Sequence, residues 1–482
     1  MIVAWLFVGS VTAAAWMILE ATGSRRDASG DPAAAPGDVA ARLAASGCGG
    51  LGVFWLAFWG LDALGVGWSR GVVLGLVAAL LAVGAAGLTV RRRRDRTSGR
   101  PRSDDARPRP PRTPPWPHVL RWLPAMAALG VFVAATAARL DVHPDFIFHW
   151  GLKGAKHFLH GGLDLEFLRA PWNQLLHPDY PGLIPGLFAA LALVEGELAL
   201  DSMLAASGPF FLLLLLAADA LLARLGASAP ARIAGLTAIA WGALAFAIGF
   251  HQAGGADLPL AAAATLGAAA LVGPRSLPRP APQNEAARDL EIGCAALFLA
   301  CTKIEGVVLG GLLVALHLAR RAREPEGRRP ATFTKTLARA GLLPLTAVIT
   351  WALWTHHHGL FLATNSGDFD LARLSIVLPE LLRAAGVRAW HGLPWLLAAL
   401  PALLLWRPSR WASLLLVGQL GFYLYAYLAA PVDTALYVAT SAPRLVLHVL
   451  PATLALAVAA LDRLSRSYSS SSPPPVRPSF LA

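Results

Sequence analysis

Residues 139–156 read Arg-Leu-Asp-Val-His-Pro-Asp-Phe-Ile-Phe-His-Trp-Gly-Leu-Lys-Gly-Ala-Lys, and they interrupt an otherwise apolar chain. An apolar run at 119–138 precedes them, and polar residues continue after them through His177-Pro-Asp179-Tyr-Pro181. A loop this dense in titratable side chains is where chemistry is expected in a protein built mainly of apolar helices. The stretch therefore predicts a polar loop that apolar helices hold at a membrane surface.

The composition agrees with that interpretation. Of the 482 residues 56% are hydrophobic and only 15% are charged, and the mean hydropathy is +0.54. These values exclude an ordinary soluble domain and predict an all-α polytopic membrane protein. The net charge of +12 comes largely from arginines between apolar runs, where the positive-inside rule accounts for them, so we expect no nucleic-acid partner. The three cysteines form no CxxC pair and are expected to be packing residues.

Charge patterning divides the chain into four parts. We expect a three-span unit at 1–90, a cytoplasmic Arg/Pro-rich linker at 91–117, a main transmembrane unit at 118–464 and a disordered cytoplasmic tail at 465–482. This arrangement predicts a multi-pass protein of the cell inner (plasma) membrane, with its N-terminus outside and its C-terminus in the cytoplasm.

The main unit contains most of the expected crossings. The segment at 182–195 is apolar over only about a dozen residues and contains Pro185, whereas a crossing takes roughly 20 residues. We therefore expect a re-entrant or interfacial helix there, which leaves every basic loop in the cytoplasm. With the three N-terminal spans this gives about 13 transmembrane helices. Those of the main unit are expected near 119–138, 203–225, 231–249, 257–273, 290–302, 304–319, 337–355, 393–406, 411–429 and 444–462.

Several charged residues lie at the outer ends of these spans. They are Asp257, Lys303, Glu305, Arg444 and His448. An unpaired charge within a span costs at least ~2.5–3.5 kcal/mol, so each must be paired or face a wet cavity. One interpretation is that Lys303–Glu305 and Asp257–Arg444 are ion pairs that close helix ends. The other is a wet pocket with carboxylates for proton abstraction and cations for an anionic leaving group.

The order of these elements resembles the GT-C fold membrane glycosyltransferases, especially the bacterial relatives of glycosyltransferase family 39. That group includes protein O-mannosyltransferases and lipid A aminoarabinose transferases. Asp145 matches the acid of its first large outer loop, and His177-Pro-Asp179-Tyr180 stands where a His-Pro motif begins an outer-surface helix. Asp257, the run 302–306 and Pro443-Arg444 are similar to its downstream features. The resemblance covers about residues 118–462.

The resemblance implies transfer of a hexose or pentose, with inversion, from a polyprenyl-phosphate donor to an envelope lipid, glycan or protein at the outer face. It implies Asp145 as the base. The chain lacks the paired Asp-Glu of many members, because Phe146 follows Asp145 and the nearest second acid is Asp141, so Asp141 stays an alternative base. We expect Asp141 to pair with Arg139 or a helix end.

Other side chains receive binding roles from the same resemblance. The expected ligands of the donor phosphate are Lys153, Lys303 and Arg444. The expected substrate-binding residues are His177, Asp179, Tyr180, Asp257, Glu305 and His448. No cofactor is expected. A divalent metal stays open without a ligand spacing that indicates one, since the consecutive His356, His357 and His358 would point ~100° apart on a helix.

A transporter or flippase of a lipid-linked or polar solute is the alternative function, because charges within spans also mark transport pathways. A transporter is expected to show internal repeats and broken helices, and the sequence shows no convincing repeat. The polar residues gather on one side instead, which favours an enzyme. A catalytically inactive assembly subunit is a third reading.

Overall fold

The computed structural model describes residues 1–22, 36–97, 120–140, 142–250, 253–272, 282–325, 327, 329–360, 367–387, 396–430 and 433–471. Within these ranges every named element is a helix, and the β-pairing is confined to an isolated bridge between Val142 and Ala253. The all-α class predicted from the sequence is confirmed, and the long apolar helices are those of a membrane-embedded protein.

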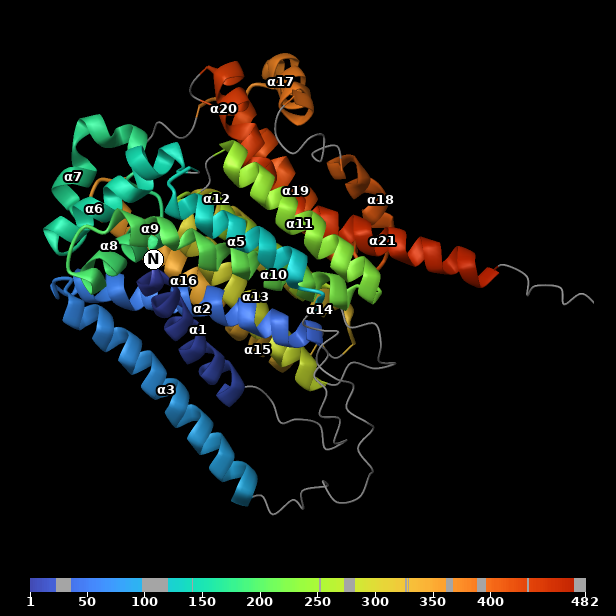
Figure 1. Ribbon diagram of the computed structural model, residues 1–482, viewed down its shortest axis with the longest axis horizontal. Coiled ribbons are helices and arrows are strands. Elements are labelled where there is room, and N and C mark those ends of the chain that lie inside the picture. Colours follow the sequence, from blue (N-terminus) through green and yellow to red (C-terminus); the bar gives the residue numbers. More distant parts are fainter. Residues whose placement is uncertain are drawn as a thin grey trace, which may run out of the picture.

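The chain order begins with three long helices and continues through shorter ones (Figure 1). The bounds are α1 Ile2–Thr22, α2 Pro36–Ala63, α3 Arg70–Thr97, α5 Leu123–Ala137, α6 Gly151–His160, α7 Leu165–Arg169, α8 Leu183–Glu195, α9 Leu200–Ala205, α10 Ser207–Arg224, α11 Ala229–Phe250, α12 Asp257–Leu271, α13 Pro282–Thr302, α14 Ile304–Arg323, α15 Pro330–Ala340, α16 Leu342–His357, α17 Leu374–Val387, α18 Leu400–Leu405, α19 Arg410–Leu428, α20 Thr434–Leu447 and α21 Leu450–Ser471.

The expected number of about 13 transmembrane helices is not supported. Among the described residues five helices are long and apolar enough to cross a membrane, or seven if each of two bent pairs is one span. The bent pairs are α15 with α16, at 52°, and α20 with α21, at 50°. Helices α5 and α12 have 15 residues each, about 22 Å, which is short of the ~30 Å hydrocarbon layer.

Several predicted spans have different boundaries in the structure, and the predicted 337–355 span crosses the break between α15 and α16. The predicted 290–302 span is the second half of α13, whose first half carries Glu285, Arg288, Asp289 and Glu291. The predicted 444–462 span is divided by the break between α20 and α21, because α20 ends at Leu447. Part of the predicted 393–406 span lies outside the described residues. Hydropathy marks where apolar residues are, and it does not report where a helix bends.

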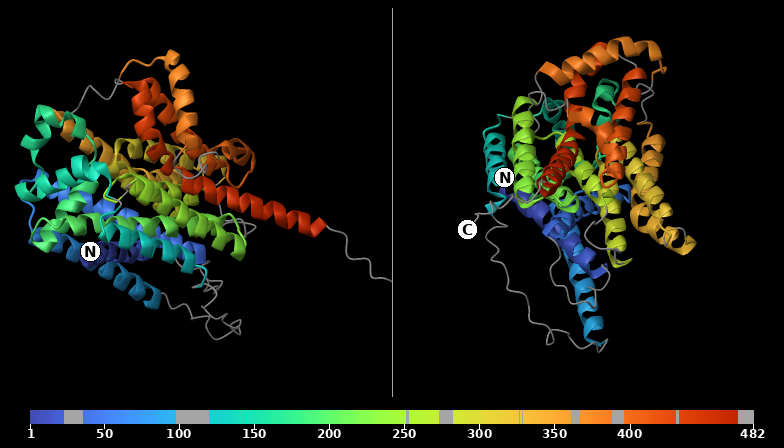
Figure 2. Two further views of the ribbon diagram at one scale, coloured as in Figure 1. Left: turned by 45° about the horizontal axis from the view of Figure 1, so that its top comes forward. Right: turned by 90° about the vertical axis from the view of Figure 1, so that its right-hand side faces the viewer.

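Helix also extends into both segments that were expected to be disordered. Helix α3 continues to Thr97, and α21 continues to Ser471. The Arg91–Arg94 run favours helix by its intrinsic propensity, and this explains the longer α3. Helix α3 packs along α1 and α21 packs on α10 and α11, and in Figures 1 and 2 the C-terminal ends of both helices project beyond the bundle. The remainder of the predicted linker and tail, 98–117 and 472–482, lies outside the described residues.

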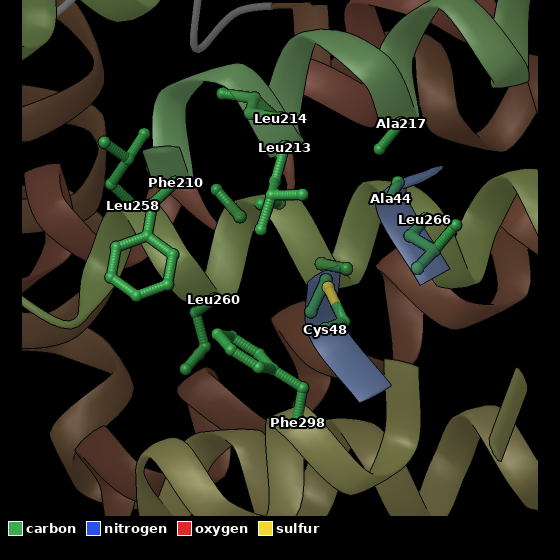
Figure 3. Close-up of a cluster of buried hydrophobic side chains, with 14 of the residues drawn as sticks. Ala44, Cys48, Phe210, Leu213, Leu214, Ala217, Leu258, Leu260, Leu266 and Phe298 are labelled. Carbon is green, nitrogen blue, oxygen red and sulfur yellow. The ribbon is translucent and has the colours of Figure 1, made fainter. Parts of the chain in front are cut away.

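Helix α2 lies at the centre of the packing. It contacts α1 on one side and α10 and α13 on the other, and α10 in turn contacts α12. In Figure 3 Cys48 of α2, Leu213 of α10 and Phe298 of α13 point into the same buried cluster. A Cβ at Gly49 would lie 2.5 Å from the Cys294 Sγ, so only glycine allows α2 to approach α13 this closely. The N-terminal helices and the main unit therefore share one core.

Helix α8 has the bounds expected for the short apolar segment, Leu183–Glu195. All of its residues from Leu183 to Ala192 are buried within the protein. A Cβ at Gly186 would lie 2.1 Å from the Trp55 ring, so α2 packs directly on its first turns. At 13 residues, about 20 Å, it is shorter than a crossing, and its position relative to the bilayer stays a prediction.

Candidate functional site

The polar loop is fixed by backbone contacts to the turn that precedes α12. The His143 N–H donates to the Ala253 carbonyl at 2.9 Å, beside the bridge from Val142, and the Asp145 N–H donates to the His143 Nδ1 at 2.8 Å. Asp145 then directly precedes a π-helical turn at Phe146–Trp150, which its side chain does not cap. These contacts bring a residue from the first polar loop next to the start of a helix more than one hundred positions later.

The turn before α12 depends on a glycine. Gly254 has φ +82°, in the left-handed region, and a Cβ there would lie 2.4 Å from the Phe146 ring. Its N–H donates to the Ser207 hydroxyl at 2.8 Å. Three residues later Asp257 begins α12, where the helix dipole favours a negative charge.

The Asp257 carboxylate is fully buried and accepts hydrogen bonds from three side chains. Its Oδ1 lies 3.2 Å from the Lys303 Nζ and 3.0 Å from the His448 Nε2, and its Oδ2 lies 3.0 Å from the Arg444 Nε. A buried carboxylate is tolerated when such donors offset its lost hydration. We call Asp145, Asp257, Lys303, Glu305, Arg444 and His448 the Asp257 cluster.

Arg444 links the buried floor of this cluster to its open side. The Nη2 donates to the Asp145 Oδ2 at 2.6 Å, while the Nε holds Asp257. The exposed fraction of the side chain rises from 1% at Asp257 to 24% at Arg444 and 33% at Asp145. One guanidinium therefore joins a carboxylate that water does not reach to one that it does.

The other side of the cluster is short of hydrogen-bond donors. The Glu305 Oε1 lies 3.1 Å from the Lys303 Nζ, but its Oε2 is buried without a hydrogen-bond partner among the described residues. The Gln419 Nε2 donates to the Glu305 carbonyl at 3.4 Å, and the Gln419 Oε1 is likewise buried and unpartnered. Buried acceptors are normally satisfied, so these two oxygens are suited to a donor supplied from outside the chain.

His448 is held from behind by Tyr423 of α19. The Tyr423 hydroxyl hydrogen-bonds the His448 Nδ1, and the His448 Nε2 faces Asp257. An ionised carboxylate only accepts, so the His448 Nε2 carries the proton directed at Asp257, and in a neutral ring the Nδ1 then accepts from the Tyr423 hydroxyl. Sequence reasoning missed Tyr423 and Gln419. Their signal was the i, i+4 spacing of polar groups on one face of an apolar helix, which Tyr427 continues.

Lys153 lies beneath the His177 turn, not within the Asp257 cluster. Its Nζ donates to the His177 carbonyl at 2.7 Å and is 3.4 Å from the His149 Nε2. His177 has φ +48°, a strained value for a residue other than glycine, and the contact to Lys153 helps to hold it. Burial lowers the pKa of Lys153 to about 7, and Asp179 opposes that shift.

The His177 turn closes one side of the site with aromatic rings. The His177 and Tyr180 rings stack with centroids 4.4 Å apart, and the Trp351 Nε1 donates to the Asp179 carbonyl at 2.9 Å. Burial, followed by the charge of Glu305, raises the pKa of Tyr180 well above its usual value. Burial, followed by the charge of Lys153, lowers the pKa of His177 to about 4. Both side chains are therefore neutral near pH 7.

His143 is a member of the site that the sequence did not single out. Its ring is buried 3.8 Å from the Asp145 carboxylate and 3.9 Å from that of Asp257. Burial, followed by the positive charge of Arg444, lowers the pKa of His143 to about 4. A neutral imidazole thus separates the two carboxylates without adding a positive charge.

The structure also describes the ion pairs that were expected from the sequence. Both expected ion pairs, Lys303–Glu305 and Asp257–Arg444, are present. Asp141 lies outside the described residues, so its expected pairing with Arg139 or a helix end stays a prediction, and Arg139 pairs with Asp201 at 2.7 Å.

The three-histidine run does not form a metal site in the structure. Arg169 hydrogen-bonds the carbonyl of His358 at 2.8 Å and its Nδ1 at 3.0 Å. Over the ranges that the structure covers, no three His, Cys, Asp or Glu side chains are grouped to hold a metal ion.

A comparison of the chain with protein-family models, with curated proteins and with solved structures finds no match.

Proposed function

We propose that this protein is an integral-membrane glycosyltransferase that moves a sugar from a polyprenyl-phosphate donor to an envelope lipid, glycan or protein. The observation that carries the proposal is the Arg444 guanidinium shared between the partly exposed Asp145 and the buried Asp257. It combines, at one end of an apolar bundle, an acid that solvent reaches and a fixed cation. Proton transfer from an acceptor and charge neutralisation on a departing phosphate need these two groups.

Arg444 is occupied in the structure, so donor binding requires an exchange of partners. A donor phosphate competes with Asp145 for the Arg444 Nη2, while Asp257 retains the Nε. The guanidinium fork suits a phosphate because it presents parallel N–H groups. The same exchange releases the Asp145 carboxylate. Donor binding therefore makes the Asp145 carboxylate available to accept a proton.

The transfer step then follows from the released carboxylate. The acceptor oxygen or nitrogen forms a bond to the anomeric carbon as the bond from that carbon to the phosphate oxygen breaks, with inversion. The acceptor proton passes to Asp145, and the electron pair of the broken bond leaves with the polyprenyl phosphate. Arg444 and Lys303 offset the negative charge on the leaving group. Asp257, with three donors already bonded, holds both cations in place.

The unpartnered acceptors support a polyhydroxylated substrate. The Glu305 Oε2 and the Gln419 Oε1 are buried and lack donors among the described residues, and the Gln419 Nε2 donates to the Glu305 carbonyl. Sugar hydroxyl groups supply such donors, and the His177 and Tyr180 rings, whose pKa values respond to burial and also to the charge of Glu305, stack on each other. A GT-C arrangement and an outer-face location of this site belong to the same proposal.

The experiment is a transfer assay with the full chain in lipid nanodiscs. Polyprenyl-phosphate hexoses and pentoses are offered one at a time with an envelope extract, and mass spectrometry follows free polyprenyl phosphate and the glycosylated acceptor. In parallel, envelope glycolipids and glycans are compared in cells with and without the protein. Release of polyprenyl phosphate coupled to a new glycan is the expected result. Unchanged envelope glycans together with no donor turnover would refute the proposal.

The transporter alternative is favoured by one feature, the bent helix pairs. Helices α20 and α21 meet at 50° beside His448, which contacts Asp257, and discontinuous helices at a buried charge are typical of transporters. A flux assay in proteoliposomes distinguishes the two functions. A transporter moves the lipid-linked sugar across the bilayer intact, whereas the proposed enzyme cleaves it.

A further inference from the structure

A laterally open apolar groove lies between α1, α2 and α10, away from the Asp257 cluster. Its volume is about 530 Å³, and its lining includes Trp5, Gly9 and Trp16 of α1 and Leu213 of α10. Among the described residues no charged side chain lines it, and its one hydroxyl, that of Thr12, donates to the Val8 carbonyl of its own helix at 2.7 Å. The groove therefore offers a mainly apolar surface without a charge to hold an ionised headgroup.

The dimensions of the groove match one hydrocarbon chain. From Trp5 to Trp16 it follows eleven residues of helix, or about 16 Å, close to one leaflet of a hydrocarbon layer of ~30 Å. Apolar side chains line the groove along this length, so a hydrocarbon chain that lies in it makes carbon contacts at ~4 Å throughout.

The surroundings of the groove are those of a lipid-facing surface. Helices α1 and α2 and the α9–α10 segment are three of the five candidate spans, and the α1 residues Gly9 and Ala13 within it are exposed. No residue of the Asp257 cluster lines it. The occupant therefore enters from the bilayer and not through the polar site.

We infer that this groove binds one acyl chain of a bilayer phospholipid, in the leaflet at the Asp257 end of the bundle. The position of Trp5 indicates this leaflet. Its ring packs against Gly208, because a Cβ at Gly208 would lie 2.8 Å from it, and Gly208 is next to Ser207. Ser207 accepts the hydrogen bond of Gly254 in the turn before Asp257. The chain thus packs against the helix that supports the polar site, and it gives α1 and α2 a role in lipid binding beyond the proposed transfer reaction.

A glycine substitution tests the inference directly. A Cβ at Gly9 meets nothing within 4 Å, so Gly9→Leu fills the groove without a clash inside the protein. Gly75→Leu on α3 is the matched control, since Gly75 is also exposed with nothing within 4 Å and does not line the groove. Equal melting temperatures of the two variants and the wild type exclude a folding defect.

The probe is phosphatidylglycerol with a diazirine in one acyl chain, mixed into vesicles of unlabelled phosphatidylethanolamine and phosphatidylglycerol. After irradiation, peptide mapping is expected to find adducts at the groove residues in the wild type and in Gly75→Leu, and to find them lost in Gly9→Leu. Adducts that persist in Gly9→Leu, or that are spread evenly over α1 to α3, would overturn the inference. Displacement of the adducts by polyprenyl phosphate at equal concentration would assign the groove to a prenyl chain and would also overturn it.

Discussion

The hairpin of α13 and α14 carries a buried charged cluster at each end. The two clusters differ in the kind of hydrogen-bond partner that they lack. At one end Lys303 and Glu305 belong to the Asp257 cluster. At the other end Glu285 pairs with Arg288 at 2.7 Å and with Arg320 at 2.7 Å. The eighteen helical positions between 285 and 303 correspond to about 27 Å, close to the thickness of a hydrocarbon layer. We call Glu285, Arg288, Arg320, Arg321 and Glu324 the Glu285 cluster.

The unpartnered atoms of the two clusters are of opposite kinds. Among the described residues they are acceptor oxygens in the Asp257 cluster and its neighbour Gln419, whereas in the Glu285 cluster they are the donor Nε atoms of Arg320 and Arg321. The Glu285, Arg288, Arg320 and Arg321 side chains are all less than one-tenth exposed, whereas a third of the Asp145 side chain is exposed. The closed cluster, rich in arginine, is suited to stabilising the fold, and the open one is suited to binding.

Thiol labelling tests on which side of the membrane each end of the α13–α14 hairpin lies, and each position either reacts or does not. Glu166 and Glu197 flank α8 and are exposed, and Lys335 is exposed on α15, which packs against the opposite half of α13. Cysteine at 166 or 197 is expected to react with an impermeant thiol reagent from outside intact cells, and cysteine at 335 only after the membrane is opened. Labelling of the unsubstituted chain gives the background from its three thiols. Reaction at only one of 166 and 197 would show that α8 crosses the membrane.

The largest activity effect is expected at Asp145. Asn keeps the size of the side chain but does not accept the proton, so transfer is expected to fall by about 10²–10⁴-fold with little change in melting temperature. Asp201→Asn is the matched control, because Asp201 is an exposed acid that pairs with Arg139 away from the site. Turnover of Asp145→Asn equal to that of Asp201→Asn would remove Asp145 from the role of base and favour the transporter.

The Glu285 cluster is expected to give the reverse result. Glu285→Gln leaves Arg288, Arg320 and Arg321 without their shared carboxylate, and breaking a buried ion pair typically costs about 3–5 kcal/mol of stability. Thermal unfolding in nanodiscs measures the loss. Turnover per folded molecule is expected to stay at the wild-type value, and a fall in turnover without a fall in stability would mean that the two clusters do not have separate roles.

Arg444 tests whether the open cluster binds a phosphate. Arg444→Ala removes every contact to the donor phosphate and is expected to cost roughly 2–5 kcal/mol in donor use, with a smaller loss for Arg444→Lys, which keeps the charge and loses the fork. The readout is the Michaelis constant and turnover with each donor. If both variants turn over the donor normally but unfold at lower temperature, Arg444 only links Asp145 to Asp257.

The smallest effect concerns acid stability near the polar loop. Burial lowers the pKa of His157 to about 3, from 6.5, so below pH 6.5 the unfolded chain binds a proton that the folded protein does not. The free energy of unfolding is therefore expected to decrease as the pH falls from 6.5 towards 3, by no more than about 2 kcal/mol from this group at pH 5. Melting temperatures at pH 7 and pH 5 measure the decrease. His157→Gln is expected to flatten it, and an unchanged slope would contradict the assignment.

Part of the site could be predicted from the sequence because charged residues are rare within apolar helices. Asp257, Lys303, Glu305 and Arg444 stood out for that reason, and the structure brings all four together. The sequence predicted the Asp257–Arg444 ion pair, but it did not indicate that Asp145 shares the same guanidinium, because that contact depends on the Val142–Ala253 bridge that fixes the loop. It also overestimated the number of crossings. Apolar runs such as α12 are buried by other helices as well as by lipid, and hydropathy does not separate the two cases.

The sequence by itself determined the class of the protein, the bounds of α8 and the identity of the charged residues at helix ends. Hydropathy and charge are properties of single residues and short segments, so they can be assessed without knowledge of tertiary contacts. Only the tertiary structure decided the pairings. Arg444 meets Asp257 across 187 positions and Asp145 across 299, and Tyr423 reaches Asp257 only through His448. Such contacts depend on how α12, α19 and α20 pack, and packing arises from the shapes of many side chains together, which no single stretch of sequence contains.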